Sequence, residues 1–203
     1  MAVAQVLERM LARRGFAVRV VTDLGALRDH ERLLAVDLLV PNWTMGTITG
    51  EQLANLLAAV RDGGVGVAGV HGGMGDAFRA EPAYHELVGG QWVAHPGDDG
   101  VTYRVRFVNP AHPLTRDLPD FTVSSEQYYM HVDPAIEVLA DTTFGSVIMP
   151  VAWVKTYGRG RVFYCSVGHR PALLEEQPLA ELLERGFTCA ARSGVGERGV
   201  RGS

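Results

Sequence analysis

This chain has few cysteines, no excess of basic residues and no long apolar runs. Cys165 and Cys189 are its two cysteines and form no CxxC pair, which argues against a zinc ribbon or a disulfide framework. The 19 Lys and Arg against 23 Asp and Glu give a net charge of −4. Nucleic acids and anionic membranes bind surfaces with an excess of positive charge, so this balance argues against both as partners. No stretch reaches the roughly 18 apolar residues of a membrane span.

Several signature motifs are also absent. No basic segment followed by an apolar one opens the chain, so we expect no secretory signal and a cytoplasmic location. GxSxG and P-loop patterns do not occur, which argues against the enzyme classes that use them. The GxGxxG spacing at residues 64–69 leads into an expected strand instead of following one, and that at residues 194–199 lies in the expected tail, so neither is a dinucleotide fingerprint. The length of 203 residues predicts one domain, over residues 1–192. Residues 193–203 are rich in Gly, Arg and Ser, and we expect a disordered tail there.

Helices and strands alternate in the first part of the chain. Apolar residues at helical spacing predict a helix over residues 3–11, and apolar runs predict strands over residues 16–21, 37–40 and 65–70. Thr49 with Gln52 forms a capping box before a further helix. Such alternation is typical of an α/β fold with a parallel sheet.

From about residue 101 the pattern changes to strands joined by short connections. The expected strands cover residues 103–108, 121–123, 136–140, 151–156 and 161–166. Short connections favour antiparallel pairing, so we predict an antiparallel extension of the sheet. Apolar residues at helical spacing between Leu179 and Phe187 then predict a final helix.

His71 is the first candidate site residue. It follows the buried run 65–70 directly, and in open α/β sheets ligands bind beyond the carboxyl ends of the strands. Gly72 and Gly73 would let a ligand approach the backbone. His169, after Gly168, ends the last buried strand and by the same argument should lie near His71. For both histidines the alternative is a structural role.

Three further positions join the predicted site. His95 follows an apolar, strand-like run, and a second imidazole near the first would make a pair of ligands or bases. Glu126 can orient an imidazole, bind a metal or accept hydrogen bonds from sugar hydroxyls. Tyr128 and Tyr129 offer apolar faces to a pyranose ring. The alternatives are a turn histidine before Pro96 and a solvated glutamate on an edge strand.

The motifs that carry these residues resemble, in order, those of the trehalose-utilisation (ThuA-like) family. They are His71-Gly72-Gly73, Gly89–Pro96, His112–Thr115, Ser125–Tyr129, Gly158–Tyr164 and Gly168-His169. The resemblance implies a three-layer, flavodoxin-like fold of the class I glutamine-amidotransferase-like superfamily, with a mostly parallel sheet. It places His71 where amidotransferases carry their nucleophilic cysteine, and His169 in the region of their catalytic histidine. A chain without that cysteine is not expected to be an amidotransferase.

A flavodoxin-like sheet begins with a central strand, whereas Met1 leads straight into the first expected helix. We therefore expect either that the start of the protein lies upstream or that the sheet is rearranged. A sheet lacking that strand could recruit one by forming a homo-oligomer.

The resemblance implies a role in the metabolism of trehalose, another disaccharide or a keto-sugar. We expect acid–base or metal-assisted catalysis, for instance by a hydrolase or isomerase, with His71, Glu126 and His169 as catalytic residues. A divalent ion such as zinc would be held by His71, His95 and His169, while Gly72, Gly73, Tyr128 and Tyr129 contact a small-molecule sugar. The alternative is a non-enzymatic sugar-binding or regulatory module that kept the fold and lost the nucleophile.

Overall fold

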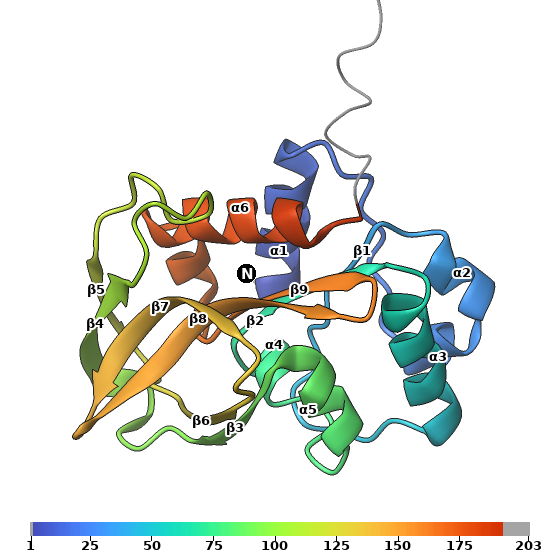
Figure 1. The fold of residues 1–203 in the computed structure, drawn as a ribbon, viewed down its shortest axis with the longest axis horizontal. Coiled ribbons are helices and arrows are strands. Elements are labelled where there is room, and N and C mark those ends of the chain that lie inside the picture. Colours follow the sequence, from blue (N-terminus) through green and yellow to red (C-terminus); the bar gives the residue numbers. More distant parts are fainter. Residues whose placement is uncertain (1, 193–203) are drawn as a thin grey trace, which may run out of the picture.

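A curled sheet of seven strands forms the centre of the computed structural model, which describes residues 2–192 (Figure 1). Its strand order is β1-β2-β9-β8-β7-β4-β5, and β3 and β6 form a separate two-stranded sheet. The strands are β1 (Leu38–Leu39), β2 (Gly66–Val70), β3 (Gly90–Ala94), β4 (Val101–Phe107), β5 (Phe121–Ser125), β6 (Tyr129–Val132), β7 (Glu137–Phe144), β8 (Val147–Tyr157) and β9 (Gly160–Cys165).

Strand pairing divides the large sheet into two parts. β1, β2 and β9 pair in parallel, whereas β9, β8, β7, β4 and β5 pair antiparallel, each with the next. The predicted α/β fold with an antiparallel extension is therefore confirmed. Antiparallel pairs outnumber parallel pairs in this sheet, so the expected mostly parallel sheet is wrong in this respect. No helix connects the strands from β4 to β9, and without such crossovers neighbouring strands run antiparallel.

Helices cover both faces of the sheet and make three layers (Figure 1). Helices α1 and α6 lie on one side, and α3, α4 and α5 lie on the other together with the β3–β6 sheet. The α-helices are α1 (Val3–Arg13), α2 (His30–Leu34), α3 (Gly50–Arg61), α4 (His71–Gly75), α5 (Pro82–Val88) and α6 (Leu179–Ala190). Short 3-10 helices are η1 (Leu24–Arg28), η2 (Asp98–Gly100) and η3 (Pro171–Glu175). Within residues 2–192, no helix has the length and apolar character needed to cross a membrane.

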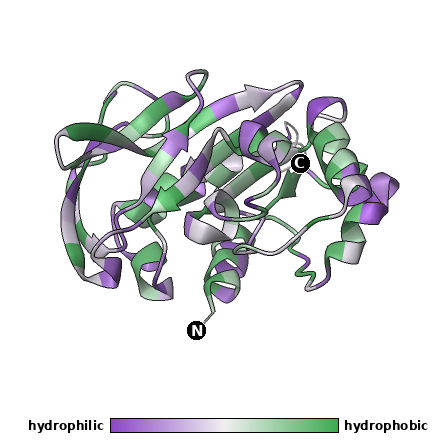
Figure 2. Cartoon of the chain, turned by 90° about the horizontal axis from the view of Figure 1, so that it is seen from below, coloured by the Kyte–Doolittle hydropathy of each residue, from purple (hydrophilic) through white to green (hydrophobic). Residues whose placement is uncertain are grey.

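Two hydrophobic clusters fill the spaces between the layers. One joins α1 and α6 to the sheet and includes Met10, Phe163 and Phe187. The other joins α3, α4 and α5 to the opposite face and includes Met74 and Trp153. In Figure 2 hydrophobic and hydrophilic residues alternate along the helices and strands. The helix periodicity of the sequence thus turns apolar stripes toward the sheet, as expected.

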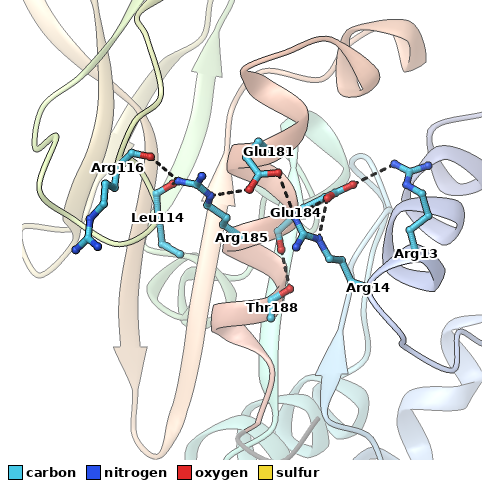
Figure 3. Close-up of polar contacts among 8 residues, drawn as sticks. All are labelled: Arg13, Arg14, Leu114, Arg116, Glu181, Glu184, Arg185 and Thr188. Atoms are coloured by element: carbon cyan, nitrogen blue, oxygen red, sulfur yellow. Dashed lines mark hydrogen bonds and ion pairs between the residues drawn. The ribbon is translucent and has the colours of Figure 1, made fainter. Parts of the chain in front are cut away.

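Helix α6 is tied to its neighbours by a row of ion pairs and hydrogen bonds (Figure 3). Arg14, at the end of α1, reaches Glu184 at 2.7 Å and Glu181 at 3.1 Å. Arg185 contacts Glu181 at 2.8 Å and donates to the backbone oxygen of Arg116 at 2.7 Å. Exposed pairs of this kind contribute little stability each, at most about 1 kcal/mol. Their effect is to fix the direction of α6 relative to α1.

The capping box predicted from Thr49 and Gln52 is present. The Thr49 hydroxyl accepts from the Gln52 backbone N–H, and the Gln52 side-chain oxygen accepts from the Thr49 N–H at 2.9 Å. The Gln52 side-chain nitrogen also donates to the Leu24 carbonyl oxygen at 2.9 Å, which joins α3 to η1. A short sequence motif therefore sets both the start of α3 and its contact with the preceding segment.

The strand predicted for residues 16–21 is wrong. That segment has no regular secondary structure, although Phe16 and Val18 still pack against the core. The apolar alternation is real, but a strand also needs a neighbour with which to exchange backbone hydrogen bonds. Among residues 2–192, no strand pairs with this segment. The expected disordered tail, residues 193–203, lies outside the described residues.

Candidate functional site

A pocket of about 300 Å³ opens at the carboxyl ends of β2 and β9. All the residues predicted for the site line it except Tyr129. This edge is where the parallel strands of an α/β sheet leave room for a ligand, because the chain turns away from the sheet there. A volume of this size lies at the lower end of the range of small-molecule pockets.

His71 is the first residue of α4 and lies at the sharp turn that follows β2. Its φ of 49° is left-handed, a conformation that costs a residue with a side chain about 1–3 kcal/mol. Gly72 and Gly73 follow in close packing, since a Cβ on Gly73 would meet the Asn42 side-chain oxygen at 2.6 Å. The turn therefore presents the His71 ring to the pocket, and the two glycines let neighbouring side chains approach it.

The ring of His71 is held in one tautomer. Its Nδ1 lies 2.8 Å from the Ser166 carbonyl oxygen, which can only accept, so Nδ1 carries the proton. Burial lowers the pKa of His71 below its ordinary value. The neutral ring then turns the lone pair of Nε2 toward the pocket. Buried protein oxygens that orient an imidazole in this way are typical partners of metal-binding histidines.

Glu126 lies at the centre of the site. One carboxylate oxygen is 3.0 Å from His71 Nε2, and the other is 3.1 Å from His169 Nδ1 and 3.8 Å from His95 Nε2. One potential ligand atom from each of His71, Glu126 and His169 lies within 4.8 Å of the others. These three residues could hold a metal ion. They come from the start of α4, from the segment after β5 and from the segment after β9.

His95, predicted as a metal ligand, lies outside the group of His71, Glu126 and His169. Its Nδ1 accepts a hydrogen bond from Trp92 Nε1 at 3.0 Å. An indole nitrogen only donates, so Nδ1 has no proton and Nε2, the atom nearer Glu126, carries it. A protonated nitrogen has no lone pair to offer a metal. His95 lines the pocket, but it does not belong to the group that could hold an ion.

Of the two predicted sugar-binding tyrosines, Tyr128 and Tyr129, one lines the pocket and the other does not. The Tyr128 hydroxyl lies 2.9 Å from His71 Nε2, and the two rings stack with centroids 4.3 Å apart. Burial raises the pKa of Tyr128, so its hydroxyl keeps its proton and can donate to His71. The ring of Tyr129 packs against Phe144 instead, and we remove Tyr129 from the predicted sugar-binding set because it does not line the pocket.

Sequence reasoning missed three contributors. Trp92 holds His95, the Ser166 carbonyl holds His71, and Asn42 lines the pocket beyond β1. The position of Asn42 could have been inferred, because it lies two residues after the expected strand 37–40 and therefore near the same edge of the sheet. No sequence signal marks a backbone carbonyl such as that of Ser166.

Neither cysteine can serve as a nucleophile in this pocket. Cys165 ends β9 fully buried, and burial raises the pKa of its thiol to about 12, whereas Cys189 is exposed on α6. A reagent that titrates thiols should therefore find Cys189 and miss Cys165 in the folded protein, and find both after denaturation. The Cys189→Ser variant should show no reactive thiol until it unfolds. A fast-reacting thiol in folded Cys189→Ser would contradict this placement.

The three layers, the turn at His71 and the pocket at the strand ends define a three-layer α/β domain with a candidate site at the edge of its sheet. Within that class, the sequence pattern of the trehalose-utilisation family, ThuA, matches residues 1–190. The chain belongs to the ThuA family. A search of curated proteins found no significant match.

Solved structures of similar fold agree with this assignment. A ThuA-like protein of Bacteroides uniformis superposes with a TM-score of 0.75 at 18% identity, covering 91% of this chain and 80% of its own. One from Parabacteroides merdae gives 0.74 at 21% identity, with coverage of 92% and 83%. A cytoplasmic protein of Salmonella typhimurium gives 0.65 at 16% identity, with coverage of 94% and 87%. At these identities the likeness concerns the fold.

Proposed function

We propose that this ThuA-family protein acts on a disaccharide or keto-sugar by acid–base or metal-assisted catalysis at the His71–Glu126–His169 cluster. The family's description, trehalose utilisation, supports carbohydrate as the substrate class. A pocket of about 300 Å³ suits a small ligand such as one sugar ring. We extend the proposal to a cytoplasmic location, as the sequence predicts.

One observation carries the proposal. The neutral His71 ring has its proton on Nδ1, so its Nε2 is an acceptor, yet this atom lies 3.0 Å from a Glu126 carboxylate oxygen, which also accepts. Two acceptors at that distance repel each other unless a proton or a cation lies between them. The Tyr128 hydroxyl, 2.9 Å from the same Nε2, can supply one proton to this group. The close pairing of two acceptors supports a cluster that shares a proton or binds a positive ion.

The donor set suits zinc. Two imidazoles and one carboxylate are the protein ligands of a common kind of catalytic zinc site, which keeps its fourth position open. His71 would bind through Nε2, and Glu126 and His169 would complete the set. When bound, zinc polarises a substrate oxygen and lowers the pKa of a water molecule.

The chain's own groups supply the remaining chemistry. In the acid–base form of the proposal, with no ion bound, Glu126 can take a proton from a sugar hydroxyl or water and return it to a leaving oxygen. The Tyr128 hydroxyl, which keeps its proton, can donate to an oxygen that gains charge. His169, 38% exposed at its side chain, lies on the open side of Glu126, where a proton can pass to solvent.

The test is turnover of trehalose, other disaccharides and their keto forms, followed by proton NMR with and without added zinc. Wild-type protein should convert at least one of them. Glu126→Gln should reduce the rate by about 100-fold or more, which is the usual contribution of a general acid or base.

Glu51→Gln is the matched control, because the side chain of Glu51 is 67% exposed on α3. It should keep the wild-type rate. Sugar binding by calorimetry without turnover of any of these substrates would reject catalysis and favour the sugar-binding module instead. Equal rates for wild type and Glu126→Gln would remove Glu126 from the mechanism.

A further inference from the structure

The indole of Trp92 fixes the orientation and the tautomer of His95. Trp92 lies in β3, and the pairing of β3 with β6 shifts register between Trp92 and Ala94. A shift of this kind changes the direction in which the following side chains point. Here Trp92 Nε1 donates to His95 Nδ1 at 3.0 Å.

The ring of Trp92 is in turn positioned by Arg79 and Asp76. The Arg79 guanidinium lies 4.3 Å from the centre of its ring, and the same guanidinium forms two hydrogen bonds with Asp76, at 2.5 and 2.9 Å. Asp76 is buried and directly follows α4, the helix that begins with His71. The segment from His71 to Asp76 therefore carries His71 at its start and, through Arg79 and Trp92, helps to position His95 from its end.

The two histidines present opposite atoms to the pocket. His71 donates its Nδ1 proton to Ser166 and leaves an Nε2 lone pair facing Glu126. His95 accepts at Nδ1 and so carries its proton on Nε2, which lies 3.8 Å from Glu126 and 3.7 Å from Asp98. Both distances are too long for a hydrogen bond, so this N–H is available to a ligand.

We propose that Trp92 is a positioning residue that locks His95 as the Nε2–H tautomer, so that His95 donates a hydrogen bond to a ligand oxygen beside Glu126. The nature of that ligand, a sugar hydroxyl or ketone oxygen, rests on the proposed function. The tautomer does not, because it follows from the Trp92 contact alone. His95 is thus kept out of the metal-binding group and serves recognition of the substrate.

Long-range proton–nitrogen NMR of uniformly ¹⁵N-labelled protein at neutral pH, without metal or sugar, tests the tautomer directly. His95→Gln identifies the ring signals of His95. In wild type, His95 should be the Nε2–H form and His71 the Nδ1–H form. Finding His95 as the Nδ1–H form in wild type overturns the proposal, whether or not any variant folds.

The Trp92→Phe variant tests the cause. Without the indole donor, the His95 signals should move toward a mixture of both tautomers, while those of His71 stay unchanged. Trp43→Phe, a like substitution of a tryptophan that is 36% exposed, should leave His95 as in wild type. An unchanged His95 tautomer in folded Trp92→Phe overturns the role of Trp92.

A second readout separates this proposal from the proposed function. Zinc affinity should be retained or increased in Trp92→Phe, because His95 gains freedom to ligate. A fall in affinity as large as that of His71→Ala would contradict the proposal. If wild type binds neither zinc nor sugar, the proposed function fails while the tautomer result stands.

Discussion

His71→Ala is expected to lower zinc affinity by roughly 100-fold or more relative to wild type. Wild type itself should bind one equivalent of zinc. Structural zinc sites gain about 10–16 kcal/mol from four ligands, or roughly 3 kcal/mol for each, and 1.4 kcal/mol is tenfold in affinity. His71 is the best-oriented ligand, since the Ser166 carbonyl fixes its tautomer. Calorimetric titration of metal-free protein with zinc measures the difference.

His95→Gln is the matched comparison. It removes another histidine of the same pocket, but one whose Nε2 carries a proton, so the loss should stay below about tenfold, the lower bound for residues that act on a metal only indirectly. Equal losses in the two variants would refute the distinction between His71 and His95. Equal binding by wild type and His71→Ala would show that zinc sits elsewhere.

The pH dependence of this binding follows from the ligand protons. Zinc requires neutral imidazoles, so affinity should fall as pH drops below about 6.5, the ordinary pKa of histidine. Burial lowers the pKa of His71, so this ligand stays neutral to a lower pH than a free imidazole would. Affinity that rises with acidity would contradict histidine ligation.

Gly66→Ala is expected to destabilise the fold by about 3 kcal/mol, the upper range for overpacking a filled core. A Cβ on Gly66 would lie 2.0 Å from the Ala190 carbonyl oxygen and 2.7 Å from its carbon, both backbone atoms at the end of α6. Neither partner can turn aside as a flexible side chain could. A loss of this size should lower the Tm by roughly 6–12 °C for a domain of this length.

Gly50→Ala is the control. Gly50 begins α3 without a positive φ, and a Cβ added there would meet no atom within 4 Å, so alanine should be neutral or stabilise by up to about 1 kcal/mol. Thermal unfolding followed by circular dichroism compares the two. The same Tm for both variants would mean that β2 and α6 do not pack as described. The position of β2, which carries the His71 turn, would then be wrong as well.

The sequence predicts the parallel half of the site well. His71 and His169 each follow a buried strand, so the pattern alone places both at strand ends, where ligands bind in such sheets. The parallel pairing of β9 with β2, which brings the two rings to 5.4 Å, is a tertiary contact that the pattern does not give. The capping box at Thr49 is a local motif and needs no tertiary information.

The rest depends on contacts that no local pattern encodes. Glu126 reaches the cluster through the docking of the antiparallel strands, and Trp92 contacts His95 where the pairing of β3 with β6 shifts register. The segment 16–21 has the alternation of a strand, but pairing is a property of two segments. The periodicity of the sequence predicts the buried face of a helix and the ends of a strand. It does not predict which other segment packs or pairs with them.

The most direct test of the account is a crystal structure of the protein with zinc, with the ion located by its anomalous scattering. We predict a zinc peak about 2.0–2.2 Å from His71 Nε2, a Glu126 oxygen and a His169 ring nitrogen, with His95 outside its shell. Zinc bound by His95 without His71, or no zinc at this cluster in crystals that hold the ion elsewhere, would contradict it.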